Sequence, residues 1–149
     1  MPSPHANGSS GSAAARATPA SMPTERLEGY VLPGLVDAHC HVDLFPKPEH
    51  LLAETERLGI TTIAVTNLPS HFHLGYRHFQ RYRRARPAVG LHPLLAMSHT
   101  ATERADFLRA LPMTSNVGEF RLDGSTYGRA FLEEQRASFE LVLGALARS

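Results

Sequence analysis

Two aspartates and two histidines alternate over a short stretch, from Asp37 through His39 and His41 to Asp43. Residues two apart in a β-strand share one face, so these four side chains are expected to point the same way. Two imidazoles on one face can reach a single divalent ion, and Asp37 or Asp43 could accept the second ring N–H and fix the tautomer. A loop with incidental histidines is the alternative, but the preceding apolar run favours a metal site.

Two more polar residues stand at comparable places further along the chain. His92 follows a short apolar run, and Glu119 comes late in another. All strands of a parallel sheet end on the same side, so their C-terminal ends gather in space. His39, His41, His92 and Glu119 are therefore expected to converge, although each alone would pass for a structural residue.

Arg121 stands two residues after Glu119 and would share its face of the strand. A guanidinium at that place could hold a substrate phosphate through its paired N–H donors. The simpler interpretation is a loop arginine that points into solvent. His71 and His73 follow another expected strand and are further candidates for substrate contact, with surface histidines as the simpler interpretation.

Apolar, β-branched runs alternate with helical patterns from Leu27 onward. Pro48 and Gly59 fit the first turn and the C-cap of one helix, and Thr100 with Glu103 fits a capping box. After a short run at 30–32, the expected strands cover 35–39, 60–66, 88–91 and 116–122. The expected helices cover 48–58, 70–84, 100–111 and 130–148. This order predicts an α/β fold of parallel strands joined by helical crossovers.

The number of units leaves two architectures open. A (β/α)8 barrel takes about 250 residues, or about 31 for each unit. Roughly 123 residues follow the N-terminal segment 1–26, which is enough for about four units on the same scale. Four units form either a small open sheet or half of a barrel, and periodicity alone does not decide between them.

Composition sets the class of protein. The chain has 149 residues, 42% of them hydrophobic, and a formal charge of +1, which indicates one domain without a global attraction to nucleic acid or membranes. Residues 1–26, rich in Ala, Ser, Pro and Gly, are expected to be a disordered extension before a domain at 27–149. No signal peptide or membrane span is recognisable. The single cysteine, Cys40, suggests a reducing, cytoplasmic location.

Three motifs, in this order and at this spacing, resemble the TatD family of metal-dependent deoxyribonucleases in the amidohydrolase-like superfamily. Residues 35–43 (LVDAHCHVD) are similar to the opening signature of that family. Residues 90–93 (GLHP) resemble its third-strand motif, and residues 117–123 (VGEFRLD) resemble its fourth-strand motif. The stretch 131–147, with Gln135 and Phe139, resembles the helix that follows.

The resemblance implies a TIM-barrel fold, of which this chain would supply the N-terminal four βα units of a (β/α)8 barrel. It implies that His39 and His41 bind one divalent ion and that Glu119 bridges two, with Mg, Mn or Zn as the metal. The remaining family ligands, two histidines and an aspartate from later strands, have no counterpart here. The chain therefore resembles only the N-terminal half of the family domain.

Some positions depart from the family pattern. Leu94 stands near the place of a second histidine, Arg121 replaces a glycine, and Gly124 replaces an aromatic residue. Residues 66–70 (TNLPS) and 122–125 (LDGS), together with the GLHP motif, also resemble the TatD-like nuclease of the Qat anti-phage system. That resemblance implies a role in anti-phage defence.

Three functions are compatible with these features. The first is metal-dependent hydrolysis of phosphodiester bonds in DNA, the second is a small-molecule amidohydrolase acting on, for example, a cyclic amide, and the third is a non-catalytic fragment or partner subunit. Glu119 favours the first, because many amidohydrolases carry a carboxylated lysine on that strand. Half of the implied ligand set is absent, so we expect little activity from this chain alone. We also expect self-association through the open edge of the last strand.

Overall fold

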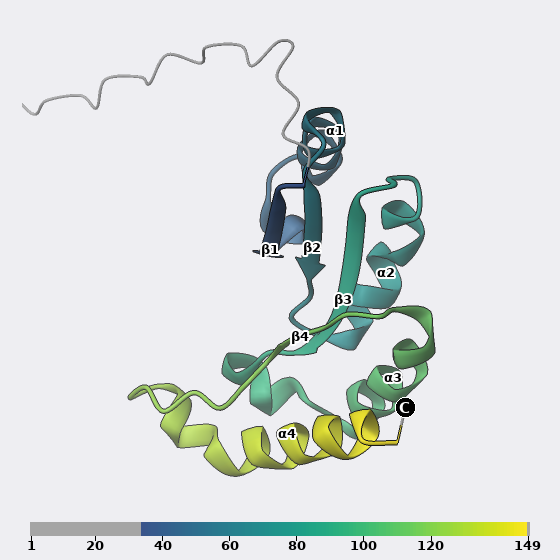
Figure 1. The fold of residues 1–149 in the computed structure, drawn as a ribbon. Coiled ribbons are helices and arrows are strands. Elements are labelled where there is room, and N and C mark those ends of the chain that lie inside the picture. Colours follow the sequence, from purple (N-terminus) through teal and green to yellow (C-terminus); the bar gives the residue numbers. More distant parts are fainter. Residues whose placement is uncertain (1–33, 149) are drawn as a thin grey trace, which may run out of the picture.

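A computed structural model describes residues 34–148, which form one sheet with a helix after each strand (Figure 1). The strands are β1 (Val36–Cys40), β2 (Thr61–Val65), β3 (Ala85–Leu91) and β4 (Val117–Phe120). The helices are α1 (Pro48–Leu58), α2 (Pro69–Phe79), α3 (Ala101–Ala110) and α4 (Leu132–Leu146). The predicted extension at 1–26 and the short run at 30–32 lie outside the described residues.

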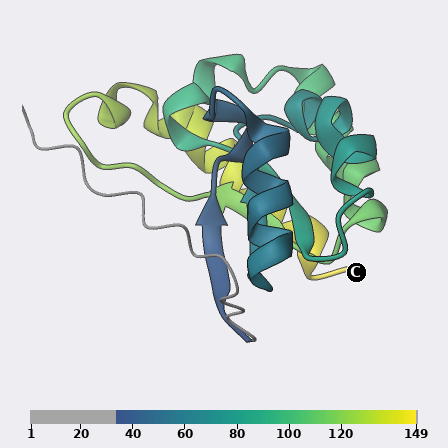
Figure 2. The same cartoon turned by 90° about the horizontal axis from the view of Figure 1, so that it is seen from above.

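The sheet has the topology of a partial barrel. All neighbouring strands are parallel and follow the order β1-β2-β3-β4 without a reversal. The sheet curls, and the helices follow its outer side (Figures 1 and 2). An open doubly wound sheet would reverse its strand order at a switch point and carry helices on both faces. The expectation of four βα units of a TIM barrel is therefore confirmed.

Two apolar clusters hold the helices in place. The larger cluster joins β3 to α2, α3 and α4 and contains the buried residues Phe72, Val89, Leu91, Phe107, Ala110, Val142 and Ala145. The smaller cluster joins α1 to β2 and the start of β3 and contains Val42, Leu52, Ala64, Phe79 and Ala85. Among residues 34–148, no helix combines the length and the apolar character needed to cross a lipid bilayer.

Helix α1 and the cap of α3 follow the sequence closely. Helix α1 begins at Pro48 and ends at Leu58, and Gly59 takes the left-handed conformation with φ of 79° that ends it. Thr100 caps α3 through its hydroxyl, which accepts from the Glu103 N–H at 3.2 Å. The capping box is one-sided, because the Glu103 carboxylate accepts from the Ser70 N–H instead. That bond ties α3 to the start of α2.

The boundary between α2 and β3 differs from the prediction. Helix α2 ends at Phe79 rather than at 84, and β3 begins at Ala85 rather than at 88. The backbone of Arg84 is already paired, because its N–H donates to the Glu56 carboxylate and its carbonyl accepts from Thr62. Pro87 lies inside β3. Because proline lacks an N–H and is normally confined to edge strands, the sequence pattern predicts that the strand begins only after it, at residue 88.

Gly90 lies where β2 and β4 approach the end of β3. The Thr66 N–H donates to the Ala88 carbonyl at 3.2 Å and to the Gly118 carbonyl at 3.4 Å, so β2 reaches across β3 to β4. A Cβ on Gly90 would lie 2.1 Å from the Thr66 oxygen and 2.5 Å from the Glu119 nitrogen. Only a residue without a side chain fits between these backbones, and the close approach tightens the curl next to Glu119.

We predict that Gly90→Ala lowers the free energy of unfolding by about 3 kcal/mol or more, because backbone atoms surround the new methyl group and cannot move aside. Urea denaturation followed by circular dichroism measures this change. Gly124→Ala is the matched control, since a Cβ on Gly124 meets nothing within 4 Å. Equal stability of the two variants would contradict the account of the curl.

Candidate metal centre

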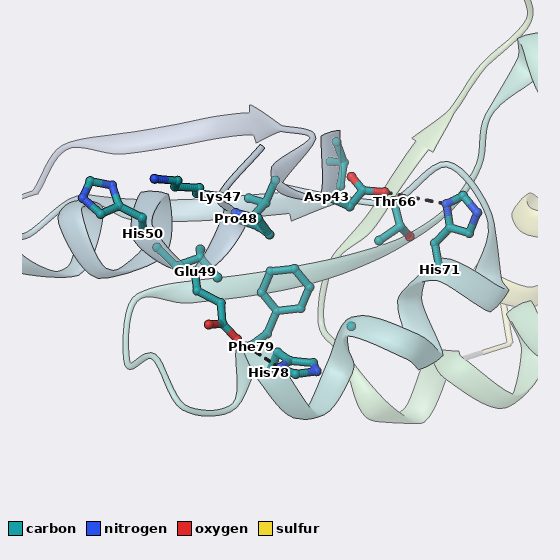
Figure 3. A pocket seen from close by; sticks show the side chains of 13 residues that line it. Asp43, Lys47, Pro48, Glu49, His50, Thr66, His71, His78 and Phe79 are labelled. Atoms are coloured by element: carbon teal, nitrogen blue, oxygen red, sulfur yellow. Dashed lines mark ion pairs between the residues drawn. The ribbon is translucent and has the colours of Figure 1, made fainter. Parts of the chain in front are cut away.

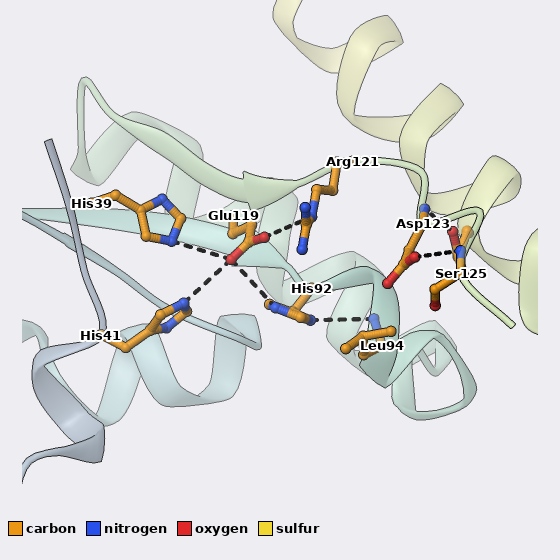
Figure 4. A network of polar contacts seen from close by, with 9 residues as sticks. His39, His41, His92, Leu94, Glu119, Arg121, Asp123 and Ser125 are labelled. Carbon is orange, nitrogen blue, oxygen red and sulfur yellow. Dashed lines mark hydrogen bonds and ion pairs between the residues drawn. The ribbon is translucent and has the colours of Figure 1, made fainter. Parts of the chain in front are cut away.

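Three imidazoles converge on one carboxylate oxygen at the C-terminal ends of the strands (Figure 4). Glu119 Oε2 lies 3.3 Å from His39 Nε2, 3.2 Å from His41 Nε2 and 3.3 Å from His92 Nε2. His39 belongs to β1, His92 follows β3, and Glu119 belongs to β4. The predicted convergence of these four residues is therefore confirmed.

The strand pattern ends earlier than the spacing of the motif suggests. β1 stops at Cys40, and a short 3-10 helix, Val42–Leu44, begins directly after His41. Val42 is buried in the apolar cluster under α1 and anchors this turn. His41 therefore reaches Glu119 from the turn rather than from the strand, and the residues after it leave the common face.

The two aspartates of the motif do not lie beside the imidazole rings as expected. Asp37 Oδ1 accepts from the backbone N–H of His39 at 3.2 Å. Asp43, carried away by the 3-10 helix, places Oδ2 3.6 Å from His71 Nδ1. The prediction that either carboxylate fixes a ring tautomer of His39 or His41 does not match these positions.

Asp43 and His71 instead face a pocket of about 520 Å³ between α1 and α2 (Figure 3). A second pair, His78 with Glu49, lies on the same pocket at 3.6 Å. His73 points to α3, where its Nε2 lies 3.2 Å from the carbonyl of Asp106. The two histidines considered for substrate contact thus lie apart from the Glu119 cluster.

His92 is oriented by its own loop. Its Nδ1 accepts from the N–H of Leu94 at 3.2 Å, so in the neutral ring the proton sits on Nε2, which faces Glu119. Burial lowers the pKa of His92, while the nearby Glu119 charge opposes this shift. A neutral His92 therefore presents an N–H to the carboxylate and holds it in place.

The three remaining ligand atoms fit one divalent ion. One ring nitrogen of His39, one of His41 and a carboxylate oxygen of Glu119 all lie within 4.8 Å of one another, and it is Nε2 of each histidine that faces Glu119. Zinc takes imidazole nitrogens at about 2.0–2.1 Å and carboxylate oxygens at about 2.0–2.2 Å, so one ion between these atoms can reach all three. Binding through Nε2 puts the His41 ring proton on Nδ1, a buried atom without a hydrogen-bond partner among residues 34–148. A complete centre has to supply that acceptor.

Arg121 is paired with Glu119 and does not simply point into solvent. Its Nε lies 2.8 Å from Glu119 Oε1, although 59% of the arginine side chain remains exposed. Arg121 thus lies in the loop after β4 and is largely exposed, as the simpler interpretation has it, but it does not only point into solvent, because its Nε pairs with Glu119. The two oxygens of Glu119 serve different partners, with imidazoles at Oε2 and a guanidinium at Oε1.

The loop after β4 is fixed by Gln135, for which the sequence patterns indicated no role in the site. Gln135 is buried in α4, where its Oε1 accepts from the Asp123 N–H and its Nε2 donates to the Gly128 carbonyl, both at 2.7 Å. A Cβ on Gly128 would lie 2.6 Å from the Asp123 oxygen, so this loop is tightly folded. The resemblance of residues 131–147 singles out Gln135 without giving it a role, and periodicity alone would place a polar helix residue on the surface.

Comparison with known protein families finds one family model that matches this chain. The family model described as TatD related DNase matches residues 36–148, which is most of the chain and includes His39, His41, His92 and Glu119. A search of curated proteins finds no match.

His99 is a second residue without a predicted role. It follows the 3-10 segment Pro93–Ser98 that begins after His92, and only 5% of it is exposed. Its Nδ1 lies 2.9 Å from the Ser138 hydroxyl of α4, so the pair fastens the loop after His92 to that helix. Burial, with a smaller contribution from the Arg104 charge, lowers the pKa of His99 to about 4.

This pKa predicts a pH-dependent loss of stability. Between its ordinary pKa of 6.5 and about 4, His99 binds a proton in the unfolded chain but not in the folded one, so stability falls as the pH falls. Near pH 4 this effect lowers the free energy of unfolding by about 3 kcal/mol, since each unit of pKa difference between the folded and unfolded chain corresponds to about 1.4 kcal/mol. Urea denaturation from pH 7 to pH 4 should show a shallower decline for His99→Gln than for the parent. A His50→Gln control, at an exposed site, should follow the parent, and identical profiles for all three proteins would contradict the assignment.

Proposed function

The chain belongs to the TatD family of metal-dependent hydrolases, and from this membership we propose that it carries the first half of a nuclease centre that hydrolyses phosphodiester bonds in DNA. The observation that supports the proposal most is the cluster of His39, His41 and Glu119, whose ligand atoms lie within 4.8 Å of one another. Two nitrogens and one carboxylate oxygen suit Zn²⁺ or Mn²⁺.

Each residue of the cluster has a separate task. His39 and His41 offer their Nε2 atoms, and Glu119 adds a carboxylate oxygen that can hold a cation. His92 keeps that carboxylate in position through its Nε2, 3.3 Å away. A divalent ion held there supplies Lewis-acid chemistry, polarising a phosphoryl oxygen and lowering the pKa of a bound water.

DNA as substrate is favoured over a small amide by the charges around the cluster. Arg121 presents a half-exposed guanidinium beside Glu119, and paired N–H donors match the oxygens of a phosphodiester. A carboxylate from β4, rather than a lysine, also supports the nuclease over the amidohydrolase alternative.

We propose that residues 34–148 by themselves show little nuclease activity. They supply three ligand atoms to the cluster, which leaves the coordination of an ion incomplete on the protein side. Hydrolysis by the family mechanism needs further ligands from strands that complete the barrel. In this proposal the described residues bind metal first and act only when that second half is present.

Further parts of the proposal concern the setting of the protein. The resemblance of residues 66–70, 90–93 and 122–125 to the Qat nuclease supports a role in anti-phage defence, and the single cysteine supports a reducing, cytoplasmic location. Self-association through the open barrel edge is supported at the start of β1, where Val36 is 54% exposed and Leu35, directly before the strand, is 50% exposed.

Metal binding is the first test. We predict that calorimetric titration with Mn²⁺ or Zn²⁺ shows binding by the parent chain and at least about tenfold weaker binding by His39→Ala/His41→Ala, because two of the three ligands are lost. The matched control is His50→Ala/His78→Ala, which removes two exposed histidines outside the cluster. Equal binding by the parent and the His39/His41 variant would contradict the metal centre.

Nuclease activity is the second test. We predict that the chain alone degrades labelled single-stranded DNA no faster than its Glu119→Ala variant in the presence of Mn²⁺. A fusion to the fifth to eighth βα units of a complete TatD-family barrel should degrade it, and Glu119→Ala should abolish that activity. A folded, metal-binding fusion that hydrolyses cyclic amides but leaves DNA intact would instead support the amidohydrolase alternative.

A further inference from the structure

The carboxylate of Glu119 is divided between two kinds of partner (Figure 4). Its Oε2 faces the three imidazoles at 3.2–3.3 Å, whereas its Oε1 lies 2.8 Å from Nε of Arg121. Only 13% of the Glu119 side chain is exposed, so solvent competes little for either oxygen. Any ion that uses both oxygens has to meet the guanidinium.

We propose that this centre holds one divalent ion, on the Oε2 side of Glu119, and that the guanidinium of Arg121 takes the place of a second ion on Oε1. The inference rests on the proposed metal-dependent function and adds the number of ions and the role of Arg121 to it. The substrate group that Arg121 would contact is a phosphodiester.

The first argument is the position of the charge. In a two-ion site with ions about 3.5–4 Å apart, a bridging carboxylate gives one oxygen to each ion. An ion on Oε1 would sit about 2.0–2.2 Å from that oxygen, and the Arg121 nitrogen already lies 2.8 Å from it. Two cations would then crowd one oxygen, and arginine cannot relieve the repulsion by losing its proton.

The second argument is that the loop carrying Arg121 is fixed. Two residues after Arg121, the Asp123 N–H donates to Oε1 of the buried Gln135 at 2.7 Å, and Asp123 Oδ1 accepts from the Ser125 N–H at 2.8 Å. The backbone next to Arg121 is therefore anchored, which limits how far its guanidinium can move from Glu119.

The third argument is the exposure of Arg121. The 2.8 Å contact with Glu119 is made through Nε, and 59% of the arginine side chain is exposed. A cation that a substrate can reach beside a metal-bound phosphodiester can neutralise the charge that a second ion would otherwise neutralise.

Calorimetric titration of Mn²⁺ into the full chain tests the inference. We expect one ion per chain for the parent and about tenfold tighter binding by Arg121→Gln, because removal of the guanidinium charge frees the carboxylate for the ion. Arg121→Lys keeps the charge and should stay close to the parent. The matched control is Arg136→Gln, which removes the same charge from an exposed i,i+3 pair on α4.

A second measurement follows phosphate contact without turnover. With each protein saturated by Mn²⁺, the paramagnetic relaxation of ³¹P in dimethyl phosphate reports binding beside the ion. We expect about tenfold weaker binding by Arg121→Gln than by Arg136→Gln. Two ions of similar affinity on the parent, or identical behaviour of these two variants, would overturn the inference. Absence of ion binding by the parent and all variants would overturn the proposed metal centre instead.

Discussion

The negative charge of Glu119 is the interaction on which the C-terminal edge of this sheet depends. A carboxylate that is only 13% exposed needs partners, because a buried charge without them is costly. Three imidazoles and one guanidinium surround it, and they come from β1, from the turn after it, from the loop after β3 and from the loop after β4. The curl of the sheet at Gly90 brings these segments together, since the Glu119 backbone lies where any side chain on residue 90 would be.

The fold was largely predictable because its signals are local. Helix α1 has the predicted bounds, since Pro48 and Gly59 act through their own backbone preferences. The end of α2 was not predictable, because the helical pattern continues to residue 84. In the structure the Arg84 carbonyl instead accepts from the Thr62 N–H of β2. The convergence of His39, His41, His92 and Glu119 follows from the common direction of parallel strands and needs no knowledge of side-chain contacts.

The parts of the site that sequence could not give all depend on where a loop turns. Asp43 leaves the strand face because β1 ends at Cys40, and no alternation of residue types marks that end. Arg121 could equally point to solvent on spacing alone, and only the fold of the loop after β4 aims it at Oε1. Gln135, which lies on α4 twelve residues after Asp123, fixes that loop by accepting from the Asp123 N–H. No local sequence pattern marks such a contact.

In this half-barrel the carboxylate of Glu119 thus organises both a metal site and a fixed cation, with one ion between His39, His41 and Oε2 of Glu119. A crystal structure of the chain with Mn²⁺, with data collected at the manganese absorption edge, would locate that ion. We expect a single anomalous peak at about 2.0–2.2 Å from those three ligand atoms, with Arg121 still on Oε1. A second peak on Oε1, or no peak at the cluster, would contradict it.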